Sequence, residues 1–274
     1  MRPEFSPEKK DDGFRRDVGG HRIRASSDGR FIWHEMIESN SLWRLDRITN
    51  RITGWIDDPD RITLYEKGKP FANLLPFVFE SKGIRMIHAG LVSWDDQGFL
   101  IAGAGGAGKS TTALSCVSGG FSFVGEDYVA IQPAEPGSFT GHSIYGSAWI
   151  ARDHLERFSG IGGRSTPGGE VEQRKSLLML GETFPDQLCS SSAITALILP
   201  QIAVGTASTI RRATRPEALK QLGPNCLMTA SRVDKIGFEY LVRIVESVPA
   251  YRLTLGCDID RIPELLKSVS VHDD

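Results

Sequence analysis

The residues with the clearest chemical potential form a glycine-rich run that ends in lysine and serine. Residues 103–110 read GAGGAGKS, which is a full match to the phosphate-binding pattern G-x-x-x-x-G-K-[ST]. Glycines allow successive backbone N–H groups to point into one concavity, because no Cβ atom stands in the way. The sequence therefore predicts a nucleoside-triphosphate site built from Gly103, Ala104, Gly105, Gly106, Ala107, Gly108, Lys109, Ser110 and Thr111.

The segments on either side of this run have the order that the motif requires. The apolar residues 99–102 are typical of a short buried strand, and residues 111–117 continue as a helix whose positive end faces the same phosphates. Lys109 can reach the β- and γ-phosphates of ATP as a point charge. The Ser110 hydroxyl can ligate Mg²⁺.

Two adjacent carboxylates follow the next apolar strand. Residues 121–124 read FSFV, and Gly125, Glu126 and Asp127 come directly after them. Ligands of α/β sheets bind at the carboxyl ends of strands, so these acids should face the γ-phosphate and its metal. One acid would suffice for Mg²⁺, and two indicate a metal ligand plus a base for a hydroxyl nucleophile. An exposed acidic turn is the alternative.

In these segments the sequence resembles the catalytic domain of HPr kinase/phosphorylase, whose P-loop core is similar to that of phosphoenolpyruvate carboxykinase. It is closer still to HPr-kinase-like serine kinases, some of which accompany peptide-maturation clusters. The resemblance covers roughly residues 80–270. The segments on which it rests are MIHAGLV at 86–92, the glycine-rich loop, GEDYVAI at 125–131, SIYGSA at 143–148, KSLLML at 175–180 and VPAYRLTLGCD at 248–258.

The resemblance implies an α/β fold with an HPr-kinase-like P-loop core, and ATP-dependent transfer to a serine-type hydroxyl on a peptide or small protein. It places His88 near the phosphates and Lys175 near the transferring group. It also gives Glu126 the role of base and leaves Asp127, with Ser110, to the metal. Homo-oligomer formation is a further expectation, since HPr kinases assemble. The family's two aspartates are Glu126 and Asp127 here.

Composition excludes several classes of partner. The 274 residues carry a net charge of −2, so no polyanion-binding field and no nucleic-acid partner are expected. The four cysteines have no metal-ligand or disulfide spacing. No apolar run approaches a membrane span and no signal peptide is visible, which favours a cytoplasmic protein without a membrane partner.

Patterning predicts three parts. Residues 1–27 are charged and without a period, typical of a flexible tail. Residues 28–83 predict a β-rich N-terminal subdomain with one helix, including strands near 31–33, 43–45, 52–55 and 62–65. Residues 84–270 form the predicted kinase domain, in which His88 lies on a strand over 84–92. The glycine-rich residues 159–173, just before Lys175, are a candidate lid or substrate loop.

Other functions share some of these features. A small-molecule kinase would have the same core and a different acceptor site, and an ATP-binding regulator could bind without transferring phosphate. An ATPase coupled to motion is disfavoured because no LSGGQ motif is present. A GTPase would need an N-K-x-D motif, which SRVD at 231–234 matches poorly.

Overall fold

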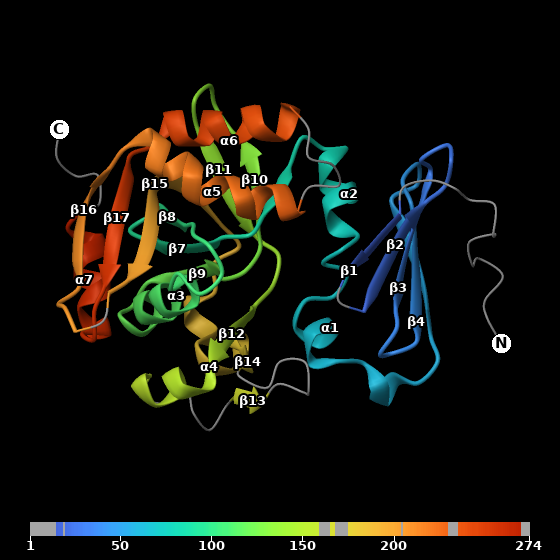
Figure 1. Cartoon of the computed structure of the whole chain (residues 1–274), viewed down its shortest axis with the longest axis horizontal. Coiled ribbons are helices and arrows are strands. Elements are labelled where there is room, and N and C mark those ends of the chain that lie inside the picture. Colours follow the sequence, from blue (N-terminus) through green and yellow to red (C-terminus); the bar gives the residue numbers. More distant parts are fainter. Residues whose placement is uncertain are drawn as a thin grey trace. The chain divides into compact units, whose positions relative to one another are not determined.

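A computed structural model describes residues 15–18, 20–158, 165–167, 175–203, 205–229 and 235–269. The chain divides into two compact units, one up to Lys82 and one from Gly83. Both helices and several β-sheets are present, so the predicted α/β class is confirmed (Figure 1).

The N-terminal unit is built on a five-stranded antiparallel meander. The strands follow one another in chain order, because short turns join each to the next. Asn40 and Asn50 close two of these turns with positive φ of 46° and 50°, a conformation that asparagine tolerates well. The strands are β1 (Arg15–Val18), β2 (His21–Ala25), β3 (Phe31–Met36), β4 (Ser41–Asp46) and β5 (Arg51–Ile56).

Short helices follow the meander and cover part of it. They are η1 (Pro59–Arg61), α1 (Leu64–Gly68) and α2 (Leu75–Glu80). Leu74 and Phe77 pack on Ile32 and Leu45 of the sheet, and this small core holds the unit together.

Two predictions for this part of the chain are wrong. The flexible tail expected to reach residue 27 contains β1 and β2. Ile23 and Ala25 alternate with polar residues, and both are buried where β2 pairs with β3. The strand expected over 62–65 is the start of α1. Thr63 accepts from Glu66 N and the Glu66 carboxylate accepts from Thr63 N, a capping box that favours the helix.

The second unit contains a mixed nine-stranded sheet. The main path runs β6-β10-β11-β15-β8-β7-β9, and β17 joins β15 and β16. The long β15 pairs in parallel with β8 on one side and with β17 on the other. The strands are β6 (Arg85–Ile87), β7 (Gly90–Trp94), β8 (Gln97–Ile101), β9 (Ser122–Gly125), β10 (Val129–Pro133), β11 (Phe139–Ser143), β15 (Ser191–Ile202), β16 (Thr209–Ala213) and β17 (Ala250–Leu255).

Helices cover both faces of this sheet (Figure 1). Phe99 and Ile101 of β8 point to one core with α3 (Lys109–Ser118) and α7 (Ile262–Lys267). Leu100, between them, belongs to the other core, which includes residues of α5 (Arg215–Thr229) and α6 (Lys235–Ser247). Successive side chains of a strand point to opposite faces, and both faces of β8 are buried, which explains the continuous apolar run from Phe99 to Ile101.

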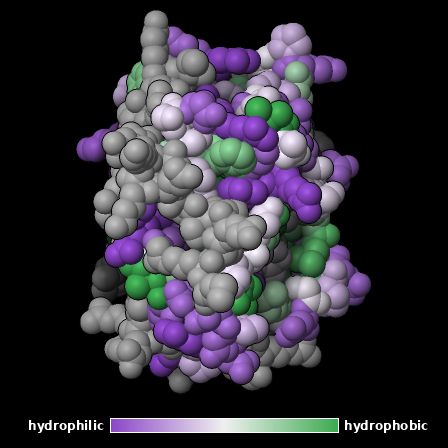
Figure 2. All heavy atoms as spheres, turned by 90° about the vertical axis from the view of Figure 1, so that its right-hand side faces the viewer, coloured by the Kyte–Doolittle hydropathy of each residue, from purple (hydrophilic) through white to green (hydrophobic). Residues whose placement is uncertain are grey.

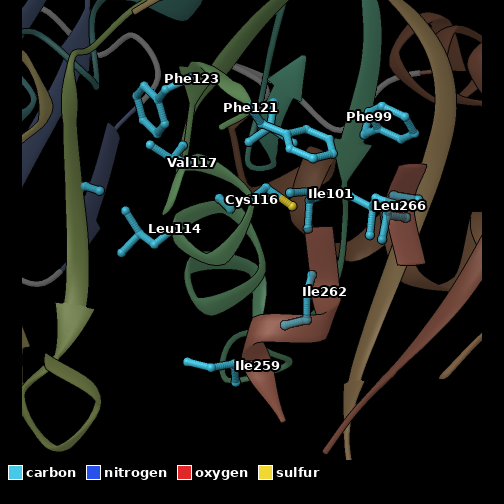
Figure 3. Close-up of a cluster of buried hydrophobic side chains, with 14 of the residues drawn as sticks. Phe99, Ile101, Leu114, Cys116, Val117, Phe121, Phe123, Ile259, Ile262 and Leu266 are labelled. Carbon is cyan, nitrogen blue, oxygen red and sulfur yellow. The ribbon is translucent and has the colours of Figure 1, made fainter. Parts of the chain in front are cut away.

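Helix α3 is packed on the first of these cores. Figure 3 shows Leu114, Cys116 and Val117 of α3 among the side chains around them, with Ile259, Ile262 and Leu266 below and beside the helix. Seven of its residues are buried, which fixes the orientation of its N-terminal end. This helix therefore holds the preceding loop in place.

A smaller three-stranded sheet lies in the same unit. It has the order β12-β14-β13, with β12 at Ser147–Ala151, β13 at Ser165–Pro167 and β14 at Lys175–Met179. Short helices follow its strands in the chain, and they are η2 (Arg152–Arg157), α4 (Leu180–Thr183) and η5 (Pro185–Gln187). Elsewhere in the unit, η6 (Ile259–Arg261) directly precedes α7. Residues 165–167 of the candidate lid at 159–173 form β13, and the other residues of that segment lie outside the described part of the chain.

In the described part of the chain, no helix is long and apolar enough to span a membrane. Hydrophobic residues on the coloured part of the face in Figure 2 form separate patches between hydrophilic ones.

Candidate active site

The topology gathers three chain segments at one edge of the nine-stranded sheet. Strand β7 lies between β8 and β9 and is antiparallel to both, so β8 and β9 end where β7 begins. Gly90 of β7 is paired with Ile101, and Leu91 with Gly125. The glycine-rich loop, the two carboxylates and His88 therefore leave the sheet at the same edge.

The loop itself depends on glycine at two positions. Gly106 and Gly108 have φ of 79° and 105°, in the left-handed region that side chains disfavour. A Cβ atom built on Gly108 would lie 2.1 Å from Cδ1 of Leu255, so the backbone there also approaches β17 closely. The loop is thus a cradle of backbone that requires glycine at these two positions.

Lys109 lies over this cradle at the start of α3. It is 6% exposed, and Nζ donates to the carbonyl oxygens of Gly103 at 2.9 Å and Ala104 at 3.3 Å. These bonds hold the ammonium group at the mouth of the loop, where a phosphate would be its natural counter-ion.

Ser110 and Glu126 meet directly. The Ser110 hydroxyl donates to Oε1 of Glu126, and the backbone N–H of Trp149 donates to Oε2 at 3.3 Å. Glu126 is 3% exposed. A buried carboxylate with both oxygens engaged is held in one orientation, and the serine of the phosphate-binding pattern is among its partners.

Asp127 faces a different partner. Its Oδ1 lies 2.6 Å from Nε2 of His88, and each side chain is 25% exposed. The His88 ring is also 5.5 Å from that of Tyr128, centroid to centroid. Asp127 and His88 are therefore a hydrogen-bonded pair that solvent can reach.

The position of His88 differs from the prediction of one strand over 84–92. The chain forms β6 and β7 as separate strands, and His88 lies in the bend between them. The two strands pair with different neighbours, β6 with β10 and β7 with β8 and β9, so the chain must turn at this point. The bend brings the imidazole to Asp127.

Lys175 is the one predicted catalytic residue that has no contact with this group in the described part of the structure. It is exposed at the first position of β14, opposite Ala151 of β12. Trp149, whose N–H contacts Glu126, lies in β12 two residues before Ala151. Lys175 therefore lies on β14, the strand that pairs with the one supporting Glu126.

Two residues of the site were missed by the sequence reasoning. Trp149 contributes only a backbone N–H, which no side-chain pattern reveals. Gly90 matters for its missing side chain, because a Cβ atom there would lie 3.2 Å from the carbonyl oxygen of Glu126. The run MIHAGLV at 86–92 indicates His88 by its histidine, and the glycine of the same run is an available signal for Gly90.

The donor set fits a magnesium nucleotide better than a tightly ligated metal. The described residues contain no cluster of three or more His, Cys, Asp and Glu side chains placed to hold a metal ion. Mg²⁺ is usually held by one or two carboxylates and completes its shell with water and phosphate oxygens. Ser110 and Glu126 offer hard oxygen ligands beside the backbone cradle, which satisfies that requirement.

Comparison with known proteins shows a distant likeness to a solved structure. No family model matches the chain, and no curated protein matches its sequence. Among solved structures, the HPr(Ser) kinase/phosphatase from Coxiella burnetii is similar to this chain with 11% sequence identity and a TM-score of 0.35. The match covers 67% of this chain and 92% of that one. The likeness does not bear on the residues of the site.

Proposed function

We propose that the second unit is an ATP-dependent kinase with an HPr-kinase-like P-loop core, which transfers the γ-phosphate of ATP to a serine-type hydroxyl on a peptide or small protein. The observation that carries the proposal is the meeting of Ser110 with buried Glu126 next to the Asp127–His88 pair, at the edge where the glycine-rich loop ends. Phosphate binding and proton removal thus have adjacent candidates.

The loop would bind the phosphates of ATP. Backbone N–H groups of residues 103–110 and the N-terminal end of α3 favour an anion, and Lys109 adds a full positive charge. Bound Mg²⁺, held by Ser110 and a carboxylate, would neutralise charge on the β- and γ-phosphates.

The contacts favour an exchange of the roles that the resemblance gave the two acids. Glu126 is buried and hydrogen-bonded to Ser110, so we assign it to the metal side. Asp127 is partly exposed and paired with His88, so we assign it the proton of the acceptor hydroxyl. His88 would orient the Asp127 carboxylate, as a hydrogen-bonded partner holds a general base in position.

Phosphotransfer assays with γ-labelled ATP and Mg²⁺ test this proposal. The substrates would be serine-containing peptides and proteins of a cell extract, with the protein alone as a second sample. Label on a serine in the wild type, lost in Lys109→Ala and in Asp127→Asn, is the expected result. Glu135→Gln serves as the matched control, because Glu135 is an exposed acid in the turn after β10.

The other outcomes separate the alternatives. Label on a low-molecular-weight compound would identify a small-molecule kinase with the same core. ATP binding without transfer to any acceptor would contradict the kinase proposal and leave a nucleotide-responsive regulator. Transfer that survives Asp127→Asn but not Glu126→Gln would restore the roles implied by the family resemblance.

A further inference from the structure

The N-terminal unit contains a cavity that the proposed kinase site does not use. It has a volume of about 280 Å³ and lies between β3, β4 and β5 on one side and the segment from Ile62 to Asn73 on the other. Its lining residues all belong to this unit. Lys67 and Pro70 of the lining are exposed, so the cavity opens to solvent. A dry cavity of about 150 Å³ can hold benzene, so this one has room for a larger ring system.

The apolar wall is formed largely by aromatic rings that the fold leaves partly uncovered. Trp43 and Phe71 meet edge to face, with centroids 4.8 Å apart, and Tyr65 lines the same cavity. Each of these three residues is only partly buried. An occupant would remove ring surface from water, and a flat aromatic group matches such a wall through edge-to-face and offset contacts.

Two backbone features keep these rings in place. Gly54 lies opposite Trp43 in the pairing of β4 with β5, and a Cβ atom on it would lie 1.8 Å from Cζ3 of the indole. Only glycine therefore lets the indole lie over β5. Phe71 has φ of 60°, which is rare for a bulky residue. Strained backbone of this kind clusters at ligand clamps and active sites, which supports a binding role for the cavity.

Two of the three charged residues at the wall are held by the fold. The Glu66 carboxylate accepts hydrogen bonds from the hydroxyl groups of Ser39 at 2.9 Å and Ser41 at 3.2 Å. Lys69 is 2% exposed, and its ammonium group lies 5.8 Å from the centroid of the Tyr65 ring. Both charges are therefore fixed parts of the wall.

Lys67 is the third charged residue, and it differs from the other two. It is exposed, and among the described residues no carboxylate pairs with its ammonium group. His34 adds no charge to the wall, because burial lowers its pKa to about 3. Two lysines against one glutamate leave the wall with an excess of one positive charge. An occupant with a single negative charge is therefore favoured.

We propose that this cavity binds a small aromatic carboxylate, with the ring against Trp43 and Phe71 and the carboxylate on the ammonium group of Lys67. The ring would cover the apolar surface that the fold leaves open, and the carboxylate would balance the charge of the wall. A free acid fits better than a segment of peptide, because the volume lies just below the range of about 300–1,000 Å³ that is usual for small-molecule pockets.

NMR titrations of the full chain, followed at the methionine methyl groups, test the proposal with matched probes. Indole-3-acetate carries ring and charge, indole-3-acetamide is its neutral counterpart, tryptamine carries the opposite charge, and octanoate has the charge without the ring. At low salt the acetate should bind about two- to fivefold more tightly than the amide, as one exposed ion pair would provide, and tryptamine should bind least. Octanoate or the amide binding as tightly as the acetate would contradict the proposal.

Lys67→Gln tests the charged contact. It should lower the affinity for the acetate to that for the amide and leave the amide unaffected. Added salt should reduce the preference for the acetate in the wild type in the same way, because it screens an exposed pair. Lys82→Gln is the matched control, since Lys82 is an exposed lysine of the same unit outside the cavity. A preference that survives Lys67→Gln would show that this lysine does not bind the carboxylate.

One measurement on the wild type and one further variant locate the site. Nuclear Overhauser contacts between the indole ring and the methyl group of Met36, which lines the cavity, place the probe without any substitution. Ala72→Leu should fill the cavity and abolish binding. Absence of the Met36 contacts, or failure of the acetate to bind the wild type, would overturn the proposal.

Discussion

Nε2 of His88 lies 2.6 Å from Oδ1 of Asp127, and the two residues reach this distance from opposite ends of neighbouring strands. His88 precedes β7, Asp127 follows β9, and the antiparallel pairing of these strands brings them together. Asp127 directly follows Glu126 in the sequence, but the Glu126 side chain points to a different partner, Ser110. Adjacent carboxylates thus have separate partners, and separate roles can be tested.

The two acids should differ in what their removal changes. Asp127→Asn should lower kcat for transfer by about 10² to 10⁴, the usual contribution of a general base, with the Mg²⁺ requirement unchanged. Glu126→Gln should instead raise the Mg²⁺ concentration for half-maximal activity. Initial rates over a Mg²⁺ series measure both. Equal shifts of the Mg²⁺ requirement in the two variants would contradict the assignment.

Lys109→Ala should cost at least about a hundredfold in transfer rate, because a charge-assisted donor to the phosphates is removed from a site with little solvent. Nucleotide binding, measured with a fluorescent ATP analogue, should weaken in parallel. Lys220→Ala, which removes an exposed lysine from α5, provides the control and should leave both quantities unchanged.

Gly108→Ala should destabilise the second unit as well as impair the loop. The new Cβ would lie 2.1 Å from Cδ1 of Leu255, and φ of 105° is strained for alanine, so a loss of about 2–4 kcal/mol in unfolding free energy is expected. Urea unfolding of Gly108→Ala, Leu255→Ala and the double variant forms a cycle. The double variant should recover the steric part only, and strictly additive losses would argue against the clash.

Acid should destabilise the N-terminal unit through His34. Burial, followed by the neighbouring His21, lowers the pKa of His34 from 6.5 to about 3. The unfolded chain therefore binds a proton that the folded chain excludes, so the stabilisation is complete above pH 6.5 and is lost as the pH falls toward 3. The slope is about 1.4 kcal/mol per pH unit.

Denaturant unfolding between pH 7.5 and 5 measures this slope. His34→Phe removes the buried imidazole and should flatten the curve in that range. A slope equal to that of the wild type would show that another group is responsible.

The cysteines should differ in reactivity. Cys116 is fully buried in the core around α3, and burial raises the pKa of its thiol, so the reactive thiolate is scarce. Cys257 is exposed. Native alkylation with iodoacetamide, read by peptide mass spectrometry, should label Cys257 and leave Cys116 unmodified until the protein is denatured.

Local pattern determined much of this protein. GAGGAGKS at 103–110, the apolar run before it and the carboxylates at 126 and 127 were readable because each depends on residues near in sequence. A glycine determines the conformation of its own turn, and the spacing of apolar residues determines which face of a strand or helix is buried. The same logic predicted α3 and the strands β3, β4 and β5 of the N-terminal unit.

Tertiary structure decided the rest, because it depends on which strands become neighbours. Pairing of β7 between β8 and β9 turned His88 toward Asp127 and Glu126 toward Ser110, and no local signal distinguishes the two acids. Pairing also ordered β1 and β2, which look like tail on composition alone, and a backbone N–H from β12 reached Glu126.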